Sequence, residues 1–292
     1  MSIIEIDREK FINAGMSYIY QLDKYPYKAV YEQVASEFDE LLSLNNQAVL
    51  NQRADFMGVG EPADYLQHLI ETEQGQLIAG IRHIGGDKNA PFIYIWPGFK
   101  VDSISHLIRT ISPYFDIFKP NALCYWCRPD CLEANGKVIQ QRFIGDIESM
   151  AKRDVSLLKA HDYYDWYQSE YALFHQQKPE YKNRITLNSK ALMDESLDQD
   201  LLFFFNQKNE RVGLIAGEKR TFLNKESIYL NEILVAHAHR GKGLGHQLLT
   251  GFVNLLTADY FICDIDSDNK PSTHAALKSG QVVFSQEVFI HF

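Results

Sequence analysis

Two cations and three glycines stand together between Arg240 and Gly245, in the run RGKGLG. An apolar period of two from Ser227 to Val235 predicts a strand before this run, and an apolar period of three to four from Leu248 to Leu256 predicts a helix after it. The run therefore lies at a helix N-terminus, where unpaired backbone N–H groups and the helix dipole favour an anion. Because glycines let a phosphate approach the backbone, the spacing predicts a phosphate or pyrophosphate site.

The spacing of the glycines separates the known phosphate loops. A P-loop needs GxxxxGK followed by Ser or Thr, which is not present here, and too little chain follows the run for a doubly wound Rossmann sheet. The remaining pattern is R-x-x-G-x-G, met by Arg240, Gly243 and Gly245. With Val235 five residues before Arg240, this pattern resembles the pyrophosphate loop of the GNAT N-acetyltransferase superfamily.

A second motif extends the resemblance. The apolar strand pattern from Phe261 to Ile265 precedes N-x-x-S-x-x-A-A-x-K-x-G-Q, which is similar to the GNAT motif N-x-x-A-x-x-L-Y-x-K-x-G-F. Asn269, Lys278 and Gly280 are in register with it. Ala276 stands where the family usually has Tyr, and Gln281 where it usually has Phe.

The resemblance implies acetyl-CoA as cosubstrate and no metal. In such proteins, backbone groups at the end of the strand hold the pantetheine arm as an added strand, the loop holds the pyrophosphate, and the Asn of the second motif contacts the arm. The residues that match these roles are Ile233, Leu234 and Val235 for the arm, Arg240, Gly241, Lys242, Gly243, Leu244 and Gly245 for the pyrophosphate, and Asn269 for the side-chain contact.

Glu232 is the candidate general base for transfer to an amine. It shares its alternation with the apolar residues Ile228, Leu230 and Leu234, and a carboxylate among core residues is costly unless it is paired or functional. The alternative is an ion pair with Lys219 or Arg220 across a hairpin. The sequence leaves both interpretations open.

No general acid is evident, because Ala276 occupies the Tyr position. Cys263, Ser272, His274 and Ser279 lie nearby in the sequence, but none is in the matching register. One solution is a water molecule as the acid, and another is a thiolate that leaves stabilised by the helix dipole alone. A third is a protein that binds acyl-CoA as a sensor or scaffold and turns over slowly or not at all.

The segment from Asp154 to Tyr181 has a helical pattern rich in aromatic residues. Its tyrosines either line an acceptor pocket or pack the helix against the sheet, and packing is the more common role of aromatic side chains.

The expected architecture is a mixed α/β (α+β) fold with a GNAT-like mixed central sheet flanked by helices, in two tandem units. Leu77-Ile78-Ala79-Gly80 recurs as Leu214-Ile215-Ala216-Gly217, and the strand, helix and strand patterns that follow agree. Residues 1–150 are expected to form a degenerate GNAT-like or accessory domain and residues 151–292 the acetyltransferase domain. Because the loop from Pro97 to Ser103 has no glycine run, a single cofactor site is expected, in the second domain.

Net charge and apolar runs exclude some kinds of partner and location. A formal charge of −9 over 292 residues argues against a nucleic-acid partner and favours an amine acceptor, either a small molecule or a peptide. The start, MSIIEIDREK, has no signal-peptide core and no apolar run is long enough for a membrane span, so the expected location is cytoplasmic, with no membrane partner. Oligomeric state is not readable from the sequence.

Two groups of residues are weak candidates for metal binding. Cys124, Cys127 and Cys131 lack an evident fourth zinc ligand, and the histidines His237 and His239 lack a third, so reduced thiols and exposed loop histidines are the simpler interpretations.

Overall fold

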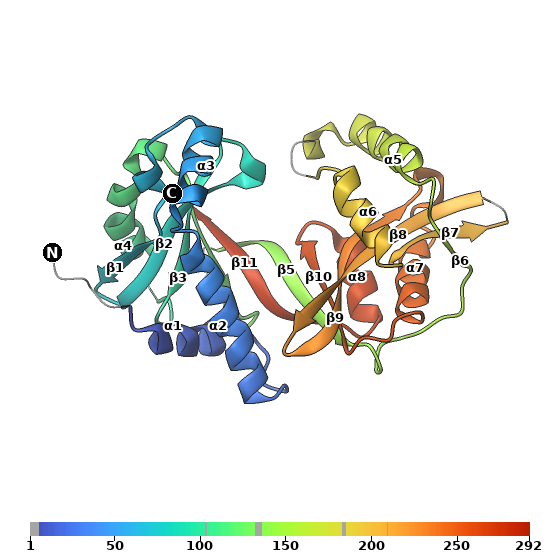
Figure 1. The fold of residues 1–292 in the computed structure, drawn as a ribbon, viewed down its shortest axis with the longest axis horizontal. Coiled ribbons are helices and arrows are strands. Elements are labelled where there is room, and N and C mark those ends of the chain that lie inside the picture. The colour runs from blue at the N-terminus through green and yellow to red at the C-terminus, as the bar shows by residue number, and fades with distance from the viewer. Residues whose placement is uncertain (1–5, 103, 132–135, 183–184, 209) are drawn as a thin grey trace. The chain divides into compact units, whose positions relative to one another are not determined.

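Figure 1 shows the computed structural model, which describes residues 6–102, 104–131, 136–182, 185–208 and 210–292. Residues 1–5 of the predicted start and Ser103 of the first-half loop lie outside these ranges. The chain divides into unit 1, residues 1–141 with 284–292, and unit 2, residues 142–283. The predicted domains differ from these units at two places, because residues 142–150 belong to unit 2 and residues 284–292 to unit 1.

Unit 1 contains helices α1 to α4 and a sheet in the order β1-β2-β3-β4-β11. The helices are Arg8–Ala14, Tyr27–Ser43, Gln47–Met57 and Ile104–Ile111, and a π-helix, Gly15–Ile19, follows α1. The strands are His68–Thr72, Gly75–His83, Pro91–Pro97, Ala122–Cys127 and Val282–His291. β1, β2 and β3 are antiparallel, β4 is parallel to β3, and β11 is antiparallel to β4.

Unit 2 contains helices α5 to α8 and strands in the order β5-β10-β9-β8-β7-β6. The helices are Tyr164–Gln177, Lys190–Asp198, Leu244–Val253 and Lys270–Lys278. The strands are Lys137–Asp146 (β5, whose first half belongs to unit 1), Leu157–Lys159, Leu202–Gln207, Glu210–Phe222, Lys225–Val235 and Tyr260–Asp266. The prediction of one helix from Asp154 to Tyr181 was therefore too long: β6 comes first, and α5 is confined to Tyr164–Gln177.

The two units repeat one pattern of strands. β7, β8 and β9 form an antiparallel meander, and α7 then crosses to β10, which is parallel to β9. β1, β2, β3, α4 and β4 follow the same order with the same directions. The predicted mixed sheet in tandem units is confirmed.

Helices cover both faces of the sheet in unit 2. Leu214 and Ile215 are neighbours on β8 and therefore point to opposite faces. Leu214 packs with the buried tyrosines Tyr167 and Tyr171 of α5, whereas Ile215 packs with Leu248 and other buried residues of α7. The site described next lies where β9 runs between these two layers (Figure 1).

Candidate functional site

A β-bulge sets the direction of Glu232. Ala216 pairs with Glu232, but the next residue of β8, Gly217, pairs with Leu230, so Asn231 is the extra residue of β9. Ile228 and Leu230 consequently face α7, whereas Glu232 and Leu234 face α5. The predicted shared alternation of Glu232 with Ile228 and Leu230 was wrong, because the bulge shifts the alternation by one residue.

The Glu232 carboxylate is held by three hydrogen bonds. Oε2 accepts from the hydroxyls of Tyr167 at 2.6 Å and Tyr171 at 2.8 Å, and Oε1 accepts from the Ile233 amide at 3.0 Å. Burial raises the pKa of Glu232 above its ordinary value, and these three donors act in the opposite direction. No described ion pair links it to Lys219, and Arg220 is bound to Glu218 instead.

The backbone of β9 has an open side next to this carboxylate. The Ala236 amide donates to the Val212 carbonyl, so in the alternating antiparallel pattern Ile233 and Val235 direct their N–H and C=O groups away from β8. On that side, β10 pairs only with residues 227–229 of β9. Ile233 and Val235 therefore lie beside a gap between diverging strands, whereas Leu234 pairs with Leu214 and packs with the cluster around α5.

The glycine run forms a turn that exposes the start of α7. A 3-10 helix, His237–His239, ends β9, and Gly241 and Gly243 follow with φ of 77° and 73°. A Cβ at either glycine would meet nothing within 4 Å. Gly243 caps α7 without a side-chain hydrogen bond, so the amides of Leu244 and Gly245 in the first turn have neither a capping side chain nor an intrahelical acceptor.

Both cations of the run are exposed and hydrogen-bonded to the nearby backbone. Arg240 Nε donates to the Val235 carbonyl at 3.0 Å, and its guanidinium lies 5.3 Å from the centre of the Phe174 ring. Lys242 Nζ donates to the Ala238 carbonyl at 3.0 Å. Positive charge and free amides thus converge at one end of α7, a suitable site for a diphosphate.

Helix α5 contacts both Glu232 and the loop after β9, which the sequence did not indicate. Glu170 accepts a 2.8 Å hydrogen bond from the His237 amide, and Gln177 lies 3.1 Å from the His237 ring nitrogen. Phe174 of the same helix lies under Arg240. Of the two roles predicted for the tyrosines, packing is confirmed for Tyr167 and Tyr171, which are buried. Their hydroxyls also donate hydrogen bonds to Glu232.

The second motif begins at the N-terminus of α8, and its two departures from the family pattern lie near the same cysteine. Asn269 caps α8, where its side chain accepts from the Ser272 amide at 3.3 Å. Ala276 is buried against Cys263 on β10, and Gln281 donates to the sulfur of the same Cys263 at 3.4 Å. Burial raises the pKa of Cys263 to about 12, so this thiol is a poor acid.

The remaining candidates for chemistry are not assembled as sites. In the described part of the chain, no group of three or more His, Cys, Asp or Glu side chains is arranged to hold a metal ion. Cys124 and Cys127 are buried and Cys131 is partly exposed. The His239 ring nitrogen Nε2 lies 3.2 Å from a carboxylate oxygen of Glu210.

None of the helices in the described ranges has the length and apolar character of a membrane span.

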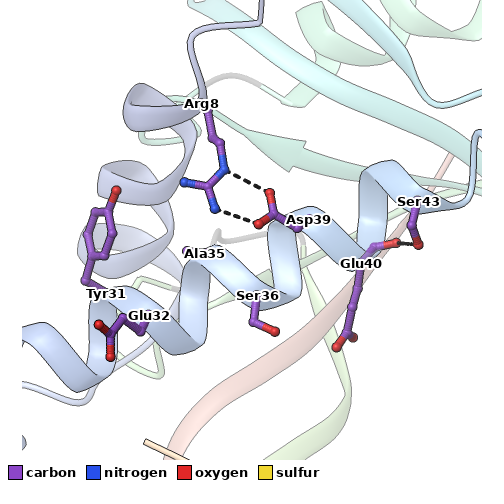
Figure 2. Close-up of a pocket in the computed structure, with 8 residues that line it drawn as sticks. All are labelled: Arg8, Tyr31, Glu32, Ala35, Ser36, Asp39, Glu40 and Ser43. Carbon is purple, nitrogen blue, oxygen red and sulfur yellow. Dashed lines mark hydrogen bonds and ion pairs between the residues drawn. The ribbon is translucent and has the colours of Figure 1, made fainter. Parts of the chain in front are cut away.

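Unit 1 has an open polar pocket along α1 and α2 (Figure 2), lined by Arg8, Tyr31, Glu32, Ala35, Ser36, Asp39, Glu40 and Ser43. Arg8 donates two hydrogen bonds to Asp39, of 2.9 and 2.6 Å, and lowers the pKa of that carboxyl group. Both side chains stay about half exposed, so the pair adds little stability. No residue predicted for the site lines this pocket.

Most of unit 2 matches a known protein family in sequence. Residues 160–280 match the sequence model described as "Acetyltransferase (GNAT) family". A comparison with curated proteins gives no match.

Several solved structures are similar in fold. A GCN5-related N-acetyltransferase from Sphaerobacter thermophilus is 10% identical, over 87% of this chain and 93% of that one, with a TM-score of 0.49. A GNAT-family acetyltransferase from Colwellia psychrerythraea is 16% identical, over 74% and 81%, with a TM-score of 0.45. Saccharomyces cerevisiae N-myristoyltransferase with bound myristoyl-CoA is 11% identical, over 87% and 75%, with a TM-score of 0.41.

Residues 160–280 therefore form a GNAT acetyltransferase domain, and this class of domain transfers acyl groups from CoA. Unit 1 repeats the strand order and strand directions of this domain.

Proposed function

We propose that unit 2 is an N-acetyltransferase that moves an acetyl group from acetyl-CoA directly to a primary amine. The observation that carries the proposal is the uncapped start of α7, with Arg240 and the glycines Gly241 and Gly243, beside the open side of β9. The diphosphate of CoA binds the amides of the loop together with Arg240 and Lys242. The pantetheine arm extends along Ile233 and Val235 toward Asn269.

Glu232 supplies the base in this proposal. It removes one proton from the substrate ammonium group, and the nitrogen lone pair then attacks the thioester carbonyl carbon. The C–N bond forms, the C–S bond breaks with its electron pair on sulfur, and water carries the second nitrogen proton to the thiolate. A raised pKa suits this role, because a base works best when its pKa lies near the working pH. No enzyme nucleophile is needed.

A calorimetric titration tests the cofactor site. Acetyl-CoA is titrated into the full chain, Arg240→Gln and the matched control Arg211→Gln. Arg211 also lies over a phenylalanine ring, Phe204, and donates to a backbone carbonyl, that of Asp162, but it is not in the loop. We expect Arg240→Gln to bind acetyl-CoA at least about tenfold more weakly than the wild type, since a charge-assisted hydrogen bond contributes roughly 1.5–3 kcal/mol. The affinity of the control should not change. Equal affinities for all three proteins would contradict the loop assignment.

The second candidate function is an acyl-CoA sensor that binds the cofactor without turnover. Ala276 favours it, because the residue at the family's Tyr position is an alanine buried in the core of unit 2. Release of free thiol from acetyl-CoA over a panel of primary amines separates the two functions. A sensor binds acetyl-CoA and releases no thiol with any amine. A transferase releases thiol, and we expect the rate of release to fall by about 10²-fold or more in Glu232→Gln.

A further inference from the structure

The open side of β9 is satisfied by side chains of the site itself. Oε1 of Glu232 accepts from the Ile233 amide, and Arg240 Nε donates to the Val235 carbonyl, each at 3.0 Å. These are the backbone groups that an added strand would pair with. A pantetheine arm that lies along β9 must therefore exchange partners with Glu232 and with Arg240.

The two oxygens of Glu232 have different surroundings. Oε2 accepts two hydrogen bonds, from Tyr167 and Tyr171, and both rings are buried in the cluster that packs α5 on the sheet. Oε1 accepts only from Ile233 among the described residues. A carboxylate has about four lone-pair sites, so Oε2 is full and Oε1 keeps one free.

The tyrosines are donors and not bases. Burial first, and then the charge of Glu232, raise the pKa of both Tyr167 and Tyr171 above the ordinary tyrosine value. Their hydroxyls therefore stay protonated at neutral pH. The Asn188 amide donates to the Tyr167 oxygen at 2.9 Å, which directs the remaining hydroxyl proton toward Glu232.

We propose that Tyr167 and Tyr171 are positioning residues that hold Glu232 by Oε2, so that Oε1 is free to exchange the Ile233 amide for the substrate proton. The proposal rests on the proposed function, because the pantetheine arm is what takes the Ile233 amide. Loss of one donor to the charged form makes a carboxylate more basic. The base is consequently strengthened when the acyl donor is in place.

The charged and titratable groups around Glu232 are few enough for a clear test. From α5, Tyr167 and Tyr171 face it. From the loop after β9, the positive charge of Arg240 acts on Tyr171 and opposes part of the rise in the Tyr171 pKa. On β8, Ala216 lies opposite Glu232, and Glu218, two residues further along, is paired with Arg220.

Carbon-13 NMR of the full chain, labelled at glutamate side-chain carboxyls, reads Glu232 directly, and the spectrum of Glu232→Gln assigns its signal. We expect Tyr167→Phe and Tyr171→Phe each to raise the titration midpoint of Glu232 by about half a pH unit or more. The matched control is Tyr163→Phe, because the Tyr163 hydroxyl donates to Asp194 at 2.5 Å instead. Added coenzyme A should raise the midpoint in the wild-type protein.

The outcomes separate this proposal from the proposed function. Unchanged midpoints in both tyrosine variants would overturn the positioning role, whether or not the protein transfers an acetyl group. Bound coenzyme A with no effect on the Glu232 midpoint would overturn the exchange at Oε1 while leaving the cofactor site intact. Absence of coenzyme A binding would overturn the proposed function itself, whereas the tyrosine comparison is made in the free protein and keeps its own outcome.

In the working enzyme, the same variants have a kinetic signature. We expect Tyr171→Phe to lower kcat about tenfold, to leave KM for acetyl-CoA unchanged, and to shift the acid limb of the pH profile to higher pH. A loss of fold would lower activity without moving the limb.

Discussion

The side-chain amide of Asn188 donates a hydrogen bond of 3.0 Å to the carbonyl of Asn231, the extra residue of the bulge in β9. The backbone amide of the same Asn188 donates to Tyr167. Asn188, two residues before α6, therefore binds both the bulge that turns Glu232 toward α5 and a tyrosine that holds the Glu232 carboxylate.

Asn188→Ala should lower both stability and turnover. We expect a loss of about 1 kcal/mol in the free energy of unfolding, the usual net contribution of one hydrogen bond, and a severalfold fall in kcat because the bulge is less well held. Asn45→Ala is the control: Asn45 also bonds the backbone, at Gln67, but in unit 1. Denaturant unfolding and acetyl-transfer kinetics would contradict the prediction if both variants lost activity equally.

Gly243→Ala separates backbone strain from cofactor binding. Gly243 and Gly58 have φ of 73° and 64°, and a Cβ meets nothing within 4 Å at either. Each substitution should destabilise its unit by roughly 1–2 kcal/mol through the left-handed backbone alone. Only Gly243→Ala should also weaken coenzyme A binding, as measured by calorimetry, since Gly58 ends α3 in unit 1. Retained binding in Gly243→Ala would show that the turn tolerates a side chain beside the ligand.

Glu232 should make the fold less stable as pH rises. Burial raises its pKa in the folded protein above the unfolded value, so between the two values the folded state holds a proton that the unfolded state has lost. The free energy of unfolding then falls with increasing pH across that window, by up to about 1.4 kcal/mol per pH unit for one proton.

Glu232→Gln removes this dependence. Relative to wild type, the variant should gain stability as pH rises through the window, and the exposed Glu226→Gln should not. Thermal unfolding measured over a pH series decides it. A stability difference between wild type and Glu232→Gln that stays constant with pH would mean that the carboxyl group titrates alike in both states.

The cysteines should differ in reactivity by exposure. Cys124, Cys127 and Cys263 are buried, whereas Cys131 is partly exposed. A thiol reagent such as dithionitrobenzoate should modify one cysteine quickly in the folded protein, and Cys131→Ser should abolish that fast phase. Denatured protein provides the full count of four. A fast phase that persists in Cys131→Ser would show that a strand-end thiol is reachable.

The sequence predicted the local parts of the site well. The strand, glycine turn and helix are at Lys225–Val235 and Leu244–Val253, because alternation, glycines and helical spacing are all local signals. The match over residues 160–280 confirms the resemblance on which the loop was assigned.

Features that depend on residues far apart in the chain could not be predicted from local sequence patterns. The bulge at Asn231 leaves no mark in the alternation, since a strand with one extra residue looks like an unbroken strand that is out of phase. The bonds from Tyr167 and Tyr171 to Glu232 span 65 and 61 residues, and no periodicity links positions so far apart. The return of residues 284–292 to unit 1 is of the same kind.

That return has a consequence for biosynthesis. β4 of unit 1 pairs with β3 on one edge and with residues 286–291 on the other, and these residues are translated after the whole of unit 2. At roughly 5–20 residues per second, the ribosome needs on the order of ten seconds or more to make residues 142–283. During that interval the second edge of β4 is open to strand addition from another nascent chain, so the first sheet is completed only after residues 286–291 have been made.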